Sequence, residues 1–101
     1  MNIYDHFAHE DEYPELNIEA MSERLAKALS FKTVYTDDKT TDWSQFDGLQ
    51  QHIYDSFPYV MTAASNVEVI GHSLLIEIPG SNPGLPALML IAHQDVVPVV
   101  P

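Results

Sequence analysis

The chain has 101 residues, of which 46% are hydrophobic, so it is long enough for one domain with a modest core and too apolar to be disordered. Its 15 acidic residues outnumber 4 basic ones, and the formal net charge of -11 disfavours binding to nucleic acid or to an anionic membrane surface. Because the chain contains no cysteine, disulfides, thiol nucleophiles and cysteine-bound zinc are excluded, and His, Asp and Glu remain as strong metal ligands.

The amino-terminal residues 1–16 are an acidic lead-in. They lack the basic and apolar segments of a signal peptide, and no apolar run in the chain approaches the length needed to cross a bilayer. We therefore expect a soluble, cytoplasmic protein. His6 and His9 have metal-ligand spacing beside Glu10, but the segment has no apolar face, and we interpret it as a solvated tail.

Two amphipathic helices are expected after the lead-in. Asn17 is a suitable N-cap for the first, which should end near Ser30. Its apolar residues recur at three- and four-residue spacing: Ile18, Met21, Leu25, Ala28 and Leu29. Asp42 and Gln45 resemble a capping box that opens the second helix, and Pro58 should end it. The expected buried stripe of this helix consists of Trp43, Phe46, Leu49, Ile53, Tyr54 and Phe57.

After Pro58 the pattern changes to that of strands. Val67 and Val69 are followed by two longer runs, residues 72–80 and 85–93, with the turn-rich segment from Pro79 to Pro86 between them. We expect these two runs to form a hairpin or neighbouring strands. Residues 87–92 are apolar at every position, which favours a strand covered on both faces, as inside an α/β sheet.

His93 and Asp95 follow directly on this last apolar run. The carboxyl ends of strands are where α/β sheets usually bind ligands, and in an extended chain residues two apart project to the same side. A carboxylate beside one ring nitrogen fixes the tautomer and makes the other nitrogen a better metal donor. The natural roles are a metal ligand for His93 and an orienting carboxylate for Asp95. An isolated His-x-Asp triplet is common, however, and a strand end followed by a turn is the structural alternative.

The longer string LMLIAHQDVVPV, residues 88–99, resembles the first metal-site motif of the carboxypeptidase S, aminoacylase and desuccinylase family of dizinc amidohydrolases, and most closely its carboxypeptidase S-like branch. Upstream, ERLAKALSFKTVY and FDGLQQHIYDSFPYV resemble the first two helices of that family, so the similarity runs from about Leu16 onward. The resemblance implies an α/β fold in which two amino-terminal helices and a β-hairpin begin a zinc-peptidase catalytic domain with a mixed sheet. It makes His93 a zinc ligand and Asp95 the catalytic-site carboxylate that holds it.

Members of that family use two zinc ions to polarise an amide carbonyl and to activate a water, whose proton a Glu removes. The resemblance implies that this Glu, the other ligands and an inserted dimerisation domain lie beyond residue 101. Residues 17–101 are then expected to be the incomplete amino-terminal portion of a hydrolase and to be inactive alone. The implied substrates are dipeptides, carboxyl-terminal residues of peptides or N-acyl amino acids, and the intact protein is expected to form a homodimer.

Two other interpretations stay open. The chain could be a small acidic, noncatalytic α/β module that binds a protein partner, or a degenerate relative that keeps the fold without the metals. We interpret His52 and His72 as structural. Ser30, Ser65 and Ser73 lack the Gly-x-Ser-x-Gly elbow of a serine hydrolase.

Overall fold

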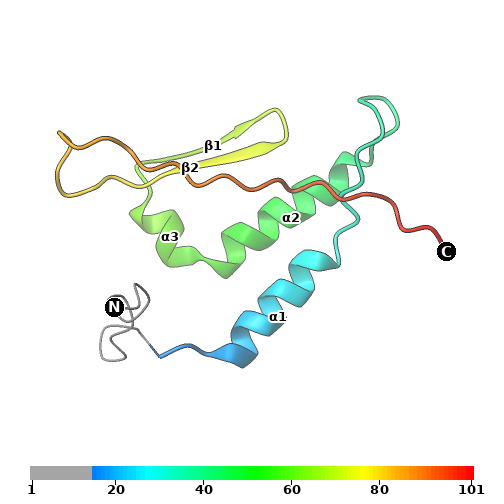
Figure 1. Cartoon of the computed structure of the whole chain (residues 1–101), viewed down its shortest axis with the longest axis horizontal. Coiled ribbons are helices and arrows are strands. Elements are labelled where there is room, and N and C mark those ends of the chain that lie inside the picture. The colour runs from blue at the N-terminus through cyan, green and yellow to red at the C-terminus, as the bar shows by residue number, and fades with distance from the viewer. Residues whose placement is uncertain (1–14) are drawn as a thin grey trace, which may run out of the picture.

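The computed structural model describes residues 15–101, so His6, His9 and nearly all of the acidic lead-in lie outside the described residues. Helices α1 (Ile18–Leu29), α2 (Trp43–Ser56) and α3 (Pro58–Ala63) come first, and strands β1 (Asn66–Ile70) and β2 (Ser73–Glu77) follow. Figure 1 shows α2 with α1 on one side and the hairpin of β1 and β2 on the other. The expected combination of helices and a hairpin in an α/β fold is confirmed. Within residues 15–101 no helix is both long and apolar enough to span a membrane.

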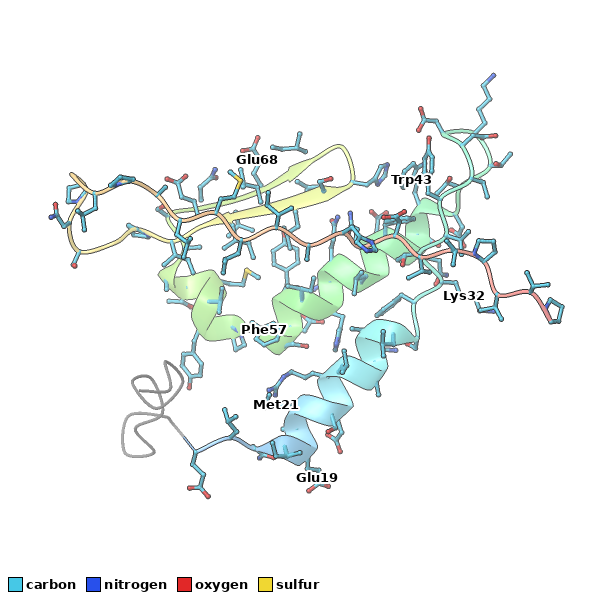
Figure 2. All side chains as sticks on the ribbon, in the orientation of Figure 1. Glu19, Met21, Lys32, Trp43, Phe57 and Glu68 are labelled. Atoms are coloured by element: carbon cyan, nitrogen blue, oxygen red, sulfur yellow. The ribbon has the colours of Figure 1, made fainter. Side chains whose placement is uncertain are left out.

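Helix α1 begins and ends where the sequence predicts. The side chain of Asn17 accepts a hydrogen bond of 3.0 Å from the N–H of Ala20, and Ser30 is the C-terminal cap. The apolar stripe is only partly covered, since Ile18, Leu25 and Leu29 are exposed. Figure 2 shows Met21 on the side of α1 that faces α2, whereas Glu19 points away from it. Capping and amphipathic spacing therefore define the helix, although much of its apolar face meets solvent.

Helix α2 also begins at the predicted cap, but the capping box does not close. Asp42 accepts hydrogen bonds from the N–H and the hydroxyl of Ser44. The side-chain oxygen of Gln45 turns the other way and accepts a hydrogen bond of 2.9 Å from the N–H of Lys32. Gln45 thus ties α2 to the chain that follows α1, and the reciprocal bond expected of a capping box is replaced by this tertiary contact.

Pro58 ends α2 as expected and also begins a further helix that the sequence pattern did not predict. It occupies the first turn of α3, a position where its missing N–H costs nothing and its fixed φ suits a helix. The prediction of strand character directly after Pro58 is therefore wrong for residues 58–63. Strand β1 starts only at Asn66.

The hairpin forms one segment earlier than expected. β1 and β2 pair antiparallel, with Val67 opposite Ile76, and Gly71 in the connecting turn has a positive φ of 62°. Closing this short turn orders few residues, which favours it over pairing across the much longer segment from Pro79 to Pro86. Residues 85–93 form no strand, and Leu88 and Leu90 are 86% and 87% exposed. The predicted strand at residues 87–92, buried on both faces, is therefore wrong; in Figure 1 this segment runs extended beside the hairpin.

The core of the described residues is small and lies on one face of α2. Phe46 is 3% exposed, and its ring packs 5.0 Å from that of Trp43, measured between centroids. The rest of the predicted stripe of α2 is half-buried, except Phe57, which is exposed. Figure 2 shows Phe57 at the carboxyl end of α2, and Glu68 on the hairpin pointing away from the helices. Aromatic packing at helical spacing, as predicted, thus supplies most of this core.

Candidate metal-binding site

His93 and Asp95 lie at the end of the extended segment, beside an open groove of about 1600 Å³. The residues of β2 line one part of this groove, and residues 85–90 and 92–95 line another. Phe46, Leu49 and Ile53 contribute from α2. The two residues therefore border a concave surface with an apolar floor, which is the common setting of a ligand site.

Asp95, two residues further along the chain, orients the His93 ring. Its Nδ1 atom lies 2.9 Å from the main-chain oxygen of Asp95 and 3.3 Å from its carboxylate oxygen Oδ1. Both oxygens accept hydrogen bonds, so a neutral ring makes these contacts only with its proton on Nδ1. Nε2 then keeps its lone pair, and the His93 side chain is 84% exposed. The expected proximity of the two residues is observed, with an additional contact to the main chain that the spacing did not predict.

A metal ion needs more ligands than this pair offers. Within residues 15–101, no group of three or more His, Asp or Glu side chains is arranged to hold a metal. Structural and catalytic zinc sites take three or four protein ligands. The chemistry of His93 fits one such ligand, because its Nδ1–H donates to Asp95 and its Nε2 keeps a lone pair for a metal, and Asp95 fits the orienting group.

Main-chain and side-chain contacts from distant parts of the chain hold the segment that carries the pair. The Thr33 hydroxyl donates a hydrogen bond of 2.7 Å to the carbonyl of Gln94, and the N–H of Val96 donates one of 2.9 Å to the carbonyl of Thr33. Val34 and Val96 form a parallel bridge, and the amide of Gln94 donates to the carbonyl of His72. Thr33 carries no signal of this role in the sequence, because it lies in a polar link with no local motif and its partner is 61 residues away.

The other two histidines of the described residues make packing contacts. His52 lies with Nε2 2.9 Å from the carbonyl oxygen of Arg24, which joins α2 to α1. His72 stacks on Trp43 with ring centroids 3.8 Å apart and planes 5° from parallel, and its Nδ1 is 3.7 Å from Asp47. These contacts agree with the interpretation of both residues as structural.

Comparison with known proteins finds similarity to a protein named "Probable carboxypeptidase S-like 1" from Dictyostelium discoideum. The two sequences are 35% identical over 75 residues, which is 72% of this chain and 16% of that protein. The chain therefore spans about one sixth of the length of this relative. No family model matches the chain, and no solved structure matches it. The similarity points to a carboxypeptidase S-like relationship over this part of the relative's length.

Proposed function

We propose that this chain supplies the first zinc ligand of a zinc-dependent, carboxypeptidase-type hydrolase. His93 is the ligand through Nε2, and Asp95 orients its ring through Nδ1. The other ligands come from polypeptide outside the 101 residues, in keeping with the much greater length of the relative. The observation that carries the proposal is the contact of His93 Nδ1 with Asp95 at the edge of the groove, on a His93 side chain that is 84% exposed.

The proposed reaction is hydrolysis of an amide bond next to a free carboxylate, in a dipeptide, a carboxyl-terminal residue or an N-acyl amino acid. Bound zinc would polarise the amide carbonyl and lower the pKa of a water. The chain's own residues have a narrower task. Asp95 keeps the His93 ring in one tautomer and one orientation, and the groove beside the pair offers apolar surface from α2 for the substrate or for the rest of the catalytic domain.

The experiment uses the longest open reading frame of the source gene that contains these residues, purified with zinc. Release of amino acids from dipeptides and N-acyl amino acids is measured with and without a chelator. We expect chelator-sensitive hydrolysis that His93→Ala abolishes, together with a loss of bound zinc. His52→Gln is the matched control, because it changes a histidine that packs between α1 and α2 and should leave zinc content and activity intact.

The 101-residue chain alone serves as a second comparison. Because His93 and Asp95 provide one ligand and its orienting group, we expect no one-to-one zinc binding tighter than about 1 μM and no hydrolysis. Tight, one-to-one binding by the isolated chain would contradict the proposal that the site is shared with other polypeptide. A longer protein that holds no zinc, or that keeps its activity in His93→Ala, would contradict the assignment of His93.

One observation favours the alternative of a noncatalytic binding module. Residues 78–94 carry no Asp, Glu, Lys or Arg, and within them Leu88, Leu90 and Ile91 are highly exposed. Exposed apolar surface of this extent usually marks a contact with another protein surface. If the reading frame encodes no further His, Asp and Glu ligands and the protein binds no zinc, this segment becomes the functional feature.

A further inference from the structure

We propose that Thr33 is a positioning residue for His93 and Asp95: its hydroxyl and carbonyl hold the main chain on both sides of Asp95 and so keep Asp95 against the His93 ring. The proposal rests on the function proposed for His93. Its test uses no metal, however, so that the two can fail separately.

Thr33 is a buried residue that bonds to the main chain on both sides of Asp95. The residue is only 2% exposed although it lies in the link between α1 and α2, which is otherwise mostly exposed. Its hydroxyl donates to the carbonyl of Gln94, the residue before Asp95. Its carbonyl accepts from the N–H of Val96, the residue after Asp95. One buried residue thus holds both peptide units that flank Asp95. The contact with Gln94 is favoured because a buried hydroxyl without a hydrogen-bond partner costs free energy.

A second anchor prevents the segment from pivoting about Thr33. The side-chain amide of Gln94 donates to the carbonyl of His72, and the side-chain amide of Gln50 donates to the same oxygen. A carbonyl oxygen has two lone pairs, so His72 connects α2, the hairpin turn and the segment of the candidate site at one atom. Gln50 is itself buried, and the Trp43 ring stacks on His72.

The anchors matter because the His93 ring has little support of its own. Its side chain is 84% exposed, and its contacts at Nδ1 are both with Asp95. The position of the ring relative to the protein therefore depends on where the main chain of Asp95 lies. If the Thr33 hydroxyl is removed, the peptide unit before Asp95 loses its bond to the buried link and is held only by the remaining contacts of Gln94 and Val96. Asp95 then moves more than in the wild type, and the His93 ring is expected to exchange between its two tautomers.

The experiment compares Thr33→Ala with Thr33→Ser in the full 101-residue chain. Both variants lose the methyl group, but only Ser keeps the hydroxyl. Long-range ¹H–¹⁵N spectra at pH 8 identify which ring nitrogen carries the proton, and the His93 signals are assigned by their absence in His93→Ala. Wild type and Thr33→Ser should have the proton on Nδ1, whereas Thr33→Ala should give averaged signals. Hydrogen exchange of the Val96 amide should rise on the order of fivefold to tenfold in Thr33→Ala.

A merely structural role has a different signature, because it would raise hydrogen exchange across α2 and the hairpin equally and would leave the His93 tautomer unchanged in the folded fraction. If Thr33→Ala does not fold, Val96→Pro decides the question. It removes the N–H that donates to the Thr33 carbonyl, and Val96→Ala is its control because it keeps that N–H. The proposal is overturned if His93 keeps its proton on Nδ1 in the folded Thr33→Ala chain or, where that chain is unfolded, in Val96→Pro.

Discussion

Gly48 lies so close to Phe31 that a β-carbon added at Gly48 would meet the Phe31 ring 2.7 Å from Cε1 and 3.0 Å from Cδ1. Gly48 is in the middle of α2, and Phe31 follows the cap of α1. The glycine, which weakens the helix by its own propensity, therefore allows α2 to approach the end of α1. Phe31 in turn lies beside His52, with ring centroids 6.1 Å apart.

We expect Gly48→Ala to lower the stability of the chain. Alanine gains about 1 kcal/mol of helix propensity, but forcing a methyl group against a packed ring typically costs about 1–3 kcal/mol. Urea unfolding followed by circular dichroism measures the balance. In a Phe31→Ala background the clash is gone, so the same substitution should be stabilising there. A stabilising effect in the wild-type background would show that the ring moves aside freely.

The cap of α2 makes the stability of its first turn depend on pH. Hydrogen bonding from the Ser44 side chain lowers the pKa of Asp42 below its ordinary value. Because the folded-state pKa is depressed, the contribution of this carboxylate is complete above the unfolded-state pKa of about 3.9 and is lost as the pH falls through the lower folded value. We therefore expect α2 to lose helicity on acidification below about pH 4.

Asp42→Asn should reduce this acid sensitivity, because asparagine also caps a helix but does not titrate. Helicity at pH 7 should be nearly unchanged, and the fall below pH 4 should be smaller than in the wild type. Asp38→Asn removes the same charge from the neighbouring loop and serves as the control. Equal acid transitions in wild type and Asp42→Asn would assign the pH dependence to other carboxylates.

Tryptophan fluorescence reports on the stack of His72 on Trp43, because Trp43 is the only tryptophan of the chain. His72→Ala removes the ring but keeps the carbonyl that accepts from Gln50 and Gln94. We expect the Trp43 emission to shift to longer wavelength as the indole gains solvent, with a stability loss of about 0.5–1.5 kcal/mol. His72→Phe keeps a flat ring and should restore most of the wild-type emission wavelength and most of the lost stability. An unchanged emission spectrum in His72→Ala would contradict the stacked arrangement.

The exposed apolar segment predicts self-association of the 101-residue chain. Residues 78–94 contain no Asp, Glu, Lys or Arg, so the side chains that give the net charge of -11 lie elsewhere and do not protect this segment. Sedimentation velocity over a range of concentrations should reveal reversible oligomers that Leu90→Lys suppresses. Tyr59→Lys adds the same charge at a residue of α3 that is 89% exposed, and it should have little effect. A monomer at all concentrations would contradict the prediction.

Local features of the sequence were sufficient to predict α1 and α2 and their caps. Asn17 and Asp42 bond to N–H groups two or three residues away, so the interaction is contained in a short stretch of chain. The proximity of His93 and Asp95 has the same origin, since they are two residues apart in an extended segment. Their roles as zinc ligand and orienting carboxylate stay predictions, supported by a motif and by similarity to a carboxypeptidase S-like protein.

Tertiary structure decided the remainder. Periodicity indicated strand-like runs without indicating which of them pair, and the short turn at Gly71 determined the hairpin of β1 and β2 while residues 85–93 stayed unpaired. The Gln45 side chain accepts a hydrogen bond from the Lys32 N–H and does not close the expected capping box. The Thr33 hydroxyl bonds to the carbonyl of Gln94, 61 residues away in the sequence. A sequence pattern reports the preferences of neighbouring residues, whereas these contacts depend on which distant backbone groups the folded chain brings within hydrogen-bonding distance.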